Sequence, residues 1–487
     1  MAGPDLADLV ARLPGPYGLN FAGVFVIRIF NHYVSKMAFI LIVTEVSILL
    51  VLAALTSGIW LADRLRPSRL DNLYLSSLVF ALVIVFSMST LGMYQHRVKD
   101  DIKNTLLRIT PSFALGFALL SMVIQLVPSI HFAHGHQSPI FLLGALGVLT
   151  TRLVVFTSAQ SAMLEGRLIL IGGGALAREC IDLASSKLGF HQFNVVGCIA
   201  LAGEACCVPA SKLLQPEPSL LLTAQKYDVH EIVVSVGDRR NESFPNRQLL
   251  ECALGGVKVT DAATFFEREA CQIRLDSLQP SYLIFGGGFN QSFFRAAVKR
   301  VFDLVASGAI CLLTWPVMLV TALWIHFDDG GPIFYQQERV GKDGKVFKVL
   351  KFRSMRSDAE QNGTPQWAST NDPRVTKVGH VIRKLRIDEL PQMLNVFKGE
   401  MSFVGPRPER GFFVDQLIVE VPYYNVRHAI KPGITGLAQV RYQYGASIDD
   451  AVHKLQYDLY YVKNNSLFLD LLILIDTVQV VLFGKGR

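Results

Sequence analysis

The stretch RKLRIDELPQ, residues 383–392, places two adjacent carboxylates, Asp388 and Glu389, inside a run of basic residues. A second dense run, MSFVGPRPER, follows at residues 401–410. A carboxylate can attack a phosphorus atom or hold a metal ion, and guanidinium groups bind phosphate oxygens through forked hydrogen bonds. A solvated helical face with salt bridges is the alternative interpretation of such a pair. The flanking basic residues favour a site for phosphate and a divalent metal.

Further motifs accompany these two runs, in a fixed order over most of residues 290–487. Together they resemble the bacterial polyprenyl-phosphate hexose-1-phosphate transferases, which are monotopic phosphoglycosyl transferases. The end of the chain looks most like the branch found with exosortase-type exopolysaccharide loci. The additional motifs are QERVG (337–341), KFRSM (351–355), KPGITGLAQ (431–439) and YDLYYV (457–462).

The composition points to a membrane protein of two or three domains. The chain has 487 residues, 51% of them hydrophobic and 18% charged, with a mean hydropathy of +0.35. Its net charge is +7, and the basic residues crowd the C-terminal third. Because no nucleic-acid motif accompanies this charge, we expect membrane lipid and a sugar-nucleotide diphosphate as partners, and no nucleic acid. The seven cysteines lack metal-site spacing, which favours reduced thiols facing the cytosol.

The N-terminal third predicts a transmembrane domain over residues 1–160. Basic residues in the N-terminal arm and in the loop 95–108 favour cytosolic termini, whereas Arg64, Arg66 and Arg69 favour the opposite orientation. An even number of spans places both ends on one side, and we take that side as the cytosol. Apolar stretches of spanning length occupy residues 37–61, 72–94, 108–130 and 139–158.

Residues 161–288 change character and predict a Rossmann-like domain with a parallel sheet. The spacing of Gly172, Gly174 and Ala177 matches the dinucleotide fingerprint. The second strand nevertheless ends without the acid that would bind a ribose hydroxyl, and Glu204 comes later. A structural or regulatory domain is therefore favoured over a functional nicotinamide site. Strands are predicted at 167–171, 193–199, 231–236, 256–260 and 281–285, with a helix at 175–187.

The catalytic domain is predicted over residues 289–487, after a hinge at the three glycines 286–288. An apolar helix near 296–327 is long enough to span a membrane. The family resemblance implies instead a re-entrant helix, broken at Pro316, that enters and leaves by the cytosolic face. The fold class is thus membrane α plus α/β, with a monotopic α+β catalytic domain. Residues 467–483 predict an amphipathic helix at the membrane surface.

The resemblance also implies the chemistry of individual side chains. Asp388 would attack the β-phosphorus of a UDP-hexose, with Mg²⁺ held by Asp388 and the phosphates. Glu389 would deprotonate or orient the acceptor phosphate. Many family members carry an Asn-Gly-Arg run after the PGITG segment, and here Arg441 is a candidate for that arginine from a shifted position. The predicted substrate-binding residues are Lys351, Arg353, Arg383, Arg407 and Arg441.

The expected activity is transfer of hexose 1-phosphate to undecaprenyl phosphate, with release of UMP. Glucose is the first choice of sugar and galactose the second, although no residue decides between them. The alternatives are a non-catalytic membrane scaffold or regulator of polysaccharide assembly, and a nucleotide-binding sugar-modifying enzyme. The expected location is the bacterial inner membrane, with the catalytic domain on the cytosolic face. A homodimer is plausible by the same resemblance.

Overall fold

The first unit of the computed structural model contains residues 33–271 together with the chain before Phe30, and the second contains residues 272–487 with the turn Phe30–His32. The predicted strand at 281–285, the glycine hinge, the boundary at 288 and the arginines at 64, 66 and 69 lie outside the described residues. The structure describes residues 26–61, 70–94, 102–127, 130, 137–159, 166–185, 193–201, 203–215, 218–237, 244–275, 293–356, 374–442, 445 and 447–483.

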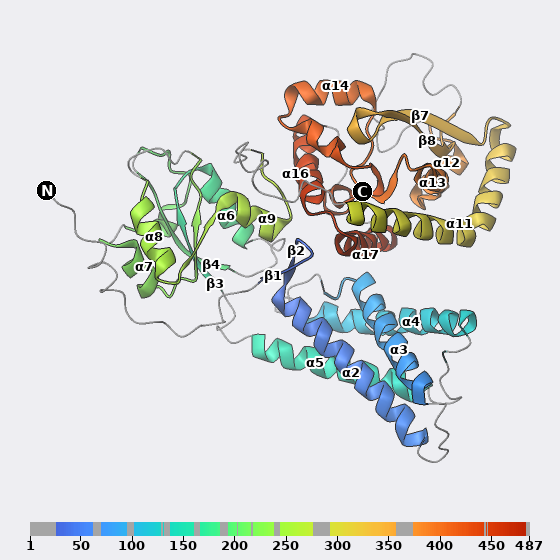
Figure 1. Ribbon diagram of the computed structural model, residues 1–487, viewed down its shortest axis with the longest axis horizontal. Coiled ribbons are helices and arrows are strands. Elements are labelled where there is room, and N and C mark those ends of the chain that lie inside the picture. Colours follow the sequence, from blue (N-terminus) through green and yellow to red (C-terminus); the bar gives the residue numbers. More distant parts are fainter. Residues whose placement is uncertain are drawn as a thin grey trace. The chain divides into compact units, whose positions relative to one another are not determined.

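Each of the four predicted apolar stretches forms a helix (Figure 1). By length and composition two of them, Lys36–Thr56 and Thr105–Leu126, could cross a membrane, while the apolar helical segments Tyr74–Thr90 and Pro139–Val155 are shorter. A short two-stranded sheet precedes the first helix. The elements are β1 (Val26–Ile29), β2 (His32–Ser35), α2 (Lys36–Leu61), α3 (Leu70–Thr90), α4 (Ile102–Leu126) and α5 (Gln137–Ala159).

The predicted parallel sheet is confirmed, with strand order β4-β3-β5-β6 and parallel pairing throughout. Side chains alternate along β3, so Leu168 and Leu170 pack beneath one pair of helices and Ile169 and Ile171 beneath the other pair. Helices therefore cover both faces (Figure 1). The elements are β3 (Gly166–Ile171), α6 (Ala175–Ser185), β4 (Phe193–Ile199), α7 (Leu220–Lys226), β5 (Glu231–Val234), α8 (Asn246–Leu254), β6 (Lys258–Asp261) and α9 (Ala262–Ala270).

The second unit combines a long helix, an antiparallel hairpin and a set of short helices. The turn of the hairpin places Asp343 and Gly344 at positive φ, as its Gly-Lys-Asp-Gly sequence predicts. The elements are α11 (Phe293–Asp329), β7 (Phe334–Val340), β8 (Val346–Phe352), α12 (Lys377–Lys384), the 3-10 helix η7 (Ile387–Gln392), α13 (Met393–Lys398), β9 (Ser402–Val404), α14 (Gly411–Glu420), η8 (Tyr424–Ala429), β10 (Gly433–Thr435), α15 (Leu437–Arg441), α16 (Ile448–Asn464) and α17 (Leu467–Phe483).

Helix α11 is bent, and both of its ends pack against other elements of the second unit (Figure 1). It has 37 residues with Pro316 inside it, and a straight helix of that length would measure about 55 Å. Near its start, Asp303 accepts hydrogen bonds from the Ser402 hydroxyl and the Phe403 amide, both at 3.0 Å. Near its end, Ile325 is buried against α12 and β8. The predicted break therefore takes the form of a bend within one helix.

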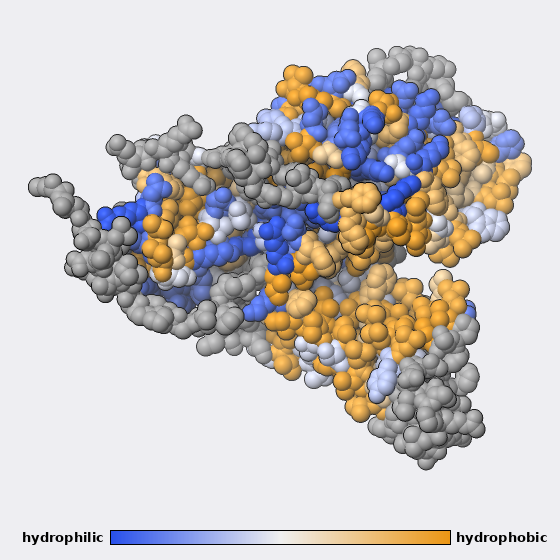
Figure 2. Space-filling view, in the orientation of Figure 1, coloured by the Kyte–Doolittle hydropathy of each residue, from blue (hydrophilic) through white to orange (hydrophobic). Residues whose placement is uncertain are grey.

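The middle of α11 exposes large apolar side chains. Leu312, Trp315 and Val320 are each more than half exposed. Figure 2 shows hydrophobic residues gathered over α11 and over the helices α2 to α5. Exposed apolar surface on this scale is typical of contact with lipid. Within the described parts of the chain, three helices including α11 are long and apolar enough to cross a membrane, which indicates a membrane protein.

Candidate active site

A sharp turn after α12 brings the two adjacent carboxylates into the site. Arg386 adopts the left-handed backbone conformation, with φ of 57°, which is uncommon for a residue with a side chain. The chain then enters η7, whose first turn carries Asp388 and Glu389, followed by Pro391. Both carboxylates are buried. The dyad therefore lies at the start of a short helix, directly after a sharp turn of the backbone.

Glu389 forms ion pairs with three nearby basic side chains. Its Oε1 atom lies 2.9 Å from the Lys351 Nζ and 3.6 Å from an Arg407 nitrogen, and its Oε2 atom lies 3.7 Å from Arg386. Burial alone would raise the pKa of Glu389, but these three positive charges outweigh it and hold the pKa well below the usual range. Glu389 is therefore a fixed anion that orients Lys351 and Arg407.

Asp388 has the opposite character. Its Oδ1 atom is buried and has no hydrogen-bond partner among the described residues. Burial, and then the neighbouring charge of Glu389, raise the pKa of Asp388 to about 6. A buried carboxylate oxygen without a donor is costly unless a ligand or metal completes it. Asp388 is thus the group of the dyad that is left available to react or to coordinate.

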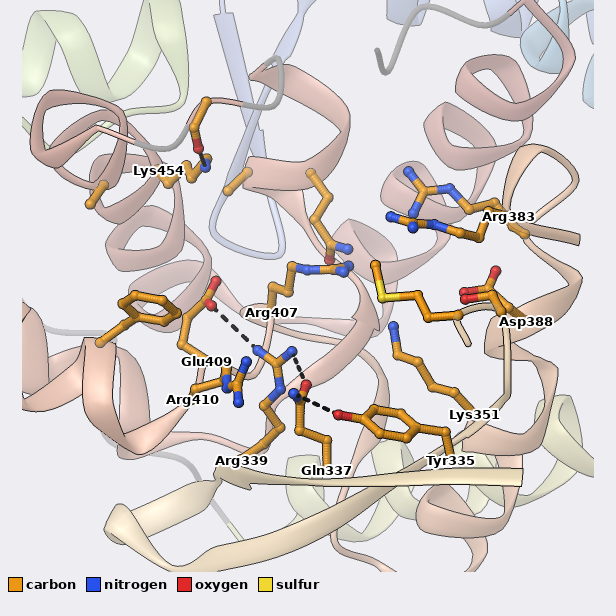
Figure 3. A pocket seen from close by; sticks show the side chains of 18 of the residues that line it. Tyr335, Gln337, Arg339, Lys351, Arg383, Asp388, Arg407, Glu409, Arg410 and Lys454 are labelled. Atoms are coloured by element: carbon orange, nitrogen blue, oxygen red, sulfur yellow. Dashed lines mark hydrogen bonds and ion pairs between the residues drawn. The ribbon is translucent and has the colours of Figure 1, made fainter. Parts of the chain in front are cut away.

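Asp388 opens into a cavity of about 480 Å³ lined by β7, β8, the loop after β9 and the helices α14 and α16 (Figure 3). Four of the five predicted substrate-binding residues line it, together with basic residues that the sequence analysis did not select. Glu389 is not among the lining residues and sits behind them. The basic residues are Arg339, Lys351, Arg353, Arg356, Arg374, Arg383, Arg386, Arg407, Arg410, Arg427 and Lys454.

Arg441 is the predicted site residue that the structure does not bring to this cavity. It lies at the end of α15, and its guanidinium is 3.3 Å from the Asp476 carboxylate. It is not among the residues that line the cavity. Lys454 and Arg410, which do line the cavity, supply positive charge there instead. Short-range sequence position could not show this, because Lys454 comes from a separate helix, α16.

Two sets of contacts hold the loop that carries Arg407. The buried Arg427 is paired with Asp458 at 2.8 Å and donates a second bond to the Arg407 carbonyl at 2.9 Å. On the other side, Lys299 and Tyr461 both donate to the carbonyl of Val404, at 3.2 and 3.0 Å. Arg407 is therefore presented by a backbone fixed at both flanks, one of them through the start of α11.

The donor set suits a metal only in part. Among the described residues, no group of three or more His, Cys, Asp and Glu side chains is arranged to hold a metal ion. Mg²⁺ needs only one or two carboxylates when substrate phosphates and waters complete its shell. The unpartnered Oδ1 atom of Asp388 fits that role. The carboxylate of Glu389 is already committed to cations.

The glycine turn of the parallel-sheet domain does not fit a dinucleotide as it stands. The amides of Gly173 and Gly174 both donate to the Glu204 carboxylate, at 2.7 and 3.0 Å. These are amides at the start of α6, where a pyrophosphate would bind in this fold. The carboxylate that sequence reasoning considered for a ribose thus occupies the phosphate position. This arrangement favours the structural or regulatory interpretation of the domain.

Comparison with known proteins agrees with the motifs. The model of the bacterial sugar transferase family matches residues 294–484. The exopolysaccharide production protein PSS of Rhizobium leguminosarum bv. phaseoli is 43% identical over 196 residues, which make up 39% of this chain and 98% of that protein. The chain belongs to the bacterial sugar transferase family. The family resemblance predicted from the motifs is thereby confirmed.

Two longer proteins that are similar to this chain have names that state a sugar. A UDP-N-acetylgalactosamine-undecaprenyl-phosphate N-acetylgalactosaminephosphotransferase of Aeromonas hydrophila is 42% identical over 58% of the chain. A UDP-galactose-lipid carrier transferase of Erwinia amylovora is 42% identical over 65% of it. The chain spans 64% of the Aeromonas protein, slightly under two thirds, and 68% of the Erwinia protein.

Proposed function

We propose that this protein transfers a sugar 1-phosphate from a UDP-sugar to undecaprenyl phosphate, as the first membrane step of exopolysaccharide synthesis. The observation that carries the proposal is the division of labour in the dyad. Glu389 holds Lys351 and Arg407, while Asp388, at the wall of a strongly basic cavity, keeps a buried oxygen that no described residue pairs with. A reactive carboxylate beside phosphate-binding cations suits phosphoryl transfer.

The reaction proceeds in two displacements. A carboxylate oxygen of Asp388 attacks the β-phosphorus of the UDP-sugar, and the bond from that phosphorus to the bridging oxygen breaks. UMP departs with the bridging oxygen and its electron pair, leaving a phospho-sugar on Asp388. An oxygen of undecaprenyl phosphate then attacks the same phosphorus. The aspartyl bond breaks, the carboxylate is regenerated, and undecaprenyl-diphospho-sugar is released.

Lys351, Arg383 and Arg407 bind the phosphate oxygens in both steps, because all three line the cavity that holds Asp388. The low pKa of Glu389 makes it a poor proton acceptor, so we assign it the orientation of Lys351 and Arg407 and no transfer of a proton. Arg353, directly after β8, also lines the cavity, and its buried guanidinium lies close to Gly331. Bound Mg²⁺, held by Asp388 and the substrate phosphates, would offset the charge of the diphosphate.

The geometry of α11 supports a re-entrant arrangement in the inner membrane. Both ends of α11 pack against other parts of the second unit, which supports our placing them on the same side of the membrane. Ile387, immediately before the dyad, packs on the apolar cluster around Ile325, so the later arm of α11 supports the site directly. With α2 to α5 as four spans, both termini and the site lie on the cytosolic face, where UDP-sugars occur.

The transferred sugar is a hexose or an N-acetylhexosamine. Similar proteins are named for N-acetylgalactosamine, galactose and glucose. Glucose and galactose, the sugars expected from the sequence, therefore share the candidate list with N-acetylgalactosamine.

Release of nucleotide from purified protein tests the proposal. The protein receives Mg²⁺, undecaprenyl phosphate and each UDP-sugar in turn, with Asp388→Asn in parallel. We expect UMP from one sugar with the wild type and none with the variant. Release of UDP would mean ordinary glycosyl transfer and overturn the mechanism. No release with any sugar would favour a non-catalytic scaffold.

A further inference from the structure

One acidic residue of the cavity has no part in the reaction proposed above. Eleven Lys and Arg residues line the cavity and only three acidic ones do, counted over the described residues. Asp388 is the reacting group, and Asp458 is buried and paired with Arg427 at 2.8 Å. Glu409 is the third, and about a third of its side chain is exposed (31%). Its negative charge stabilises the neighbouring cations Arg339, Arg427 and Lys454, but it weakens phosphate binding at this end of the cavity.

Glu409 lies at the end of the cavity opposite Asp388, with Arg407 between them (Figure 3). Its carboxylate makes one ion pair among the described residues, with Arg339 at 3.5 Å, which leaves most of its acceptor capacity unused. Arg339 is itself held by Gln337 at 2.6 Å, and Gln337 by Tyr335 at 3.1 Å. This row of side chains along β7 fixes Glu409 at one end of the site.

The chemistry of this end suits a neutral, hydroxyl-rich ligand. An ionised carboxylate repels phosphate but accepts hydrogen bonds from two adjacent hydroxyl groups. Phe413, in the first turn of α14, also lines the cavity, and a phenylalanine ring has an aromatic face. Such a face packs against the apolar side of a sugar ring or against a pyrimidine. Phosphate therefore belongs near Asp388, and hydroxyl groups belong near Glu409.

We propose that Glu409 binds vicinal hydroxyl groups of the UDP-sugar and is a specificity-determining residue for the donor. This inference rests on the proposed function and refines it. Two parts of the donor carry such hydroxyls, the ribose and the transferred sugar. Hydrogen-bonded sites of this kind discriminate strongly against ligands that lack the hydroxyl, because the site group is then left unpaired.

Equilibrium binding to protein carrying Asp388→Asn tests this assignment without turnover. Calorimetry compares that background with the same protein carrying Glu409→Gln. Glu420→Gln is the matched control, because Glu420 is exposed on α14 and contacts Gln416 rather than the cavity. We expect Glu409→Gln to weaken binding of the UDP-sugar at least tenfold, and Glu420→Gln to change it less than twofold. Unchanged donor affinity in the Glu409→Gln protein would overturn the proposal.

UMP and deoxy donors locate the hydroxyls. If Glu409 binds the ribose, UMP loses the same factor of ten, and a 2′-deoxyuridine donor shows no further loss in the variant. If it binds the transferred sugar, UMP binding is unchanged and deoxy-sugar donors remove the difference. An equal loss with every deoxy donor would overturn the proposal by showing a general structural effect. Wild-type turnover is measured separately, so failure of the proposed function is distinguishable from failure of this assignment.

Discussion

The glycine turn before α6 and the basic cavity beside η7 both present donors that suit an anion, and each has acidic residues beside those donors. In the first, the Glu204 carboxylate takes both glycine amides. In the second, Glu389 takes Lys351 and Arg407, and Asp388 keeps an oxygen without a partner in the described structure. In the glycine turn a single carboxylate occupies both amide donors, so the site is closed. In the dyad Glu389 pairs with the cations, and the adjacent Asp388 remains available to react.

The difference predicts opposite effects on stability within the dyad. Asp388→Asn should reduce transfer at least about 10³-fold, because the nucleophile is gone. The folded-state pKa of Asp388 is raised, so its ionised form costs stability above that pKa, and the neutral isostere removes up to about 3 kcal/mol of cost at pH 8. The pKa of Glu389 is lowered, so Glu389→Gln should destabilise by about 3 kcal/mol.

Apparent melting temperatures of the two variants in one detergent, at pH 8, check this prediction. The shifts should have opposite signs, with Asp388→Asn more stable than the wild type. At pH 5 the gain from Asp388→Asn should shrink, because the wild-type Asp388 is then largely protonated in the fold. Equal losses of stability in both variants would contradict the assigned division between the two carboxylates.

The rate of the first displacement should fall at acid pH. Asp388 must be ionised to attack, and its pKa is about 6. The rate of the UMP burst, measured without acceptor, should therefore fall about tenfold per pH unit below that value. The charge of Lys351 lowers the pKa of Asp388, so Lys351→Met should move the acid limb to higher pH. Lys398→Met, at an exposed position on α13, serves as the control. A burst unchanged between pH 5 and 8 would argue against Asp388 as the nucleophile.

The sequence predicted the parts of the site that lie in short local runs. Lys351, Arg383 and Arg407 could be selected because they stand at basic positions of motifs that the chain shares with the resembling family. Tyr335, Gln337 and Arg339 were missed, although strand alternation places them on one face of β7 and could have revealed them. Lys454 could not be found this way, because it reaches the cavity from α16 through tertiary packing.

The fold, like the site, could be predicted where it depends on local sequence patterns. Alternating apolar strands and helices predicted the parallel sheet, because each element buries a face of its own sequence. The closure of the glycine turn could not be predicted, because it depends on a hydrogen bond that the Gly174 amide donates to Glu204, 30 residues later in the chain. The position of Arg441 was missed for the same reason, since Asp476 lies in a different helix. Sequence pattern identifies candidate donors, but folding decides which of them are already paired.

Breaking the link between α11 and the Arg407 loop should reduce turnover less than loss of Asp388 does. Lys299 lies 2.6 Å from the fully buried Asp470 and donates to the Val404 carbonyl. Lys299→Met leaves Asp470 without its ion-pair partner, which should cost about 3–5 kcal/mol. Because Val404 precedes the Arg407 loop, we expect turnover to fall about tenfold as well.

A double variant separates packing from charge in this link. Lys299→Met combined with Asp470→Asn removes both charges and should recover most of the lost thermal stability. Recovery of stability without recovery of turnover would sharpen the assignment of Lys299 as a positioning residue. Normal donor affinity in Lys299→Met would contradict a role in holding the Arg407 loop.

The closed glycine turn should not affect catalysis, and loss of the Glu204 carboxylate should change only the local stability of the turn. Glu204→Ala should leave transfer within about twofold of the wild type. It exposes two amides that were paired, so hydrogen exchange of the segment 168–180 should become faster, by the equivalent of about 1–2 kcal/mol. Asp182→Ala, an exposed site on α6, is the control.

Ligand titration then decides what the closure means. In the variant, millimolar phosphate should slow that exchange again by occupying the freed amides, whereas the wild type should not respond. Micromolar binding of a nicotinamide dinucleotide to the wild type would show that Glu204 is displaced by ligand. The glycine turn would then be a working site in which Glu204 gives way to an incoming phosphate, whereas Glu389 of the dyad keeps its ion pairs with Lys351 and Arg407 when phosphate binds.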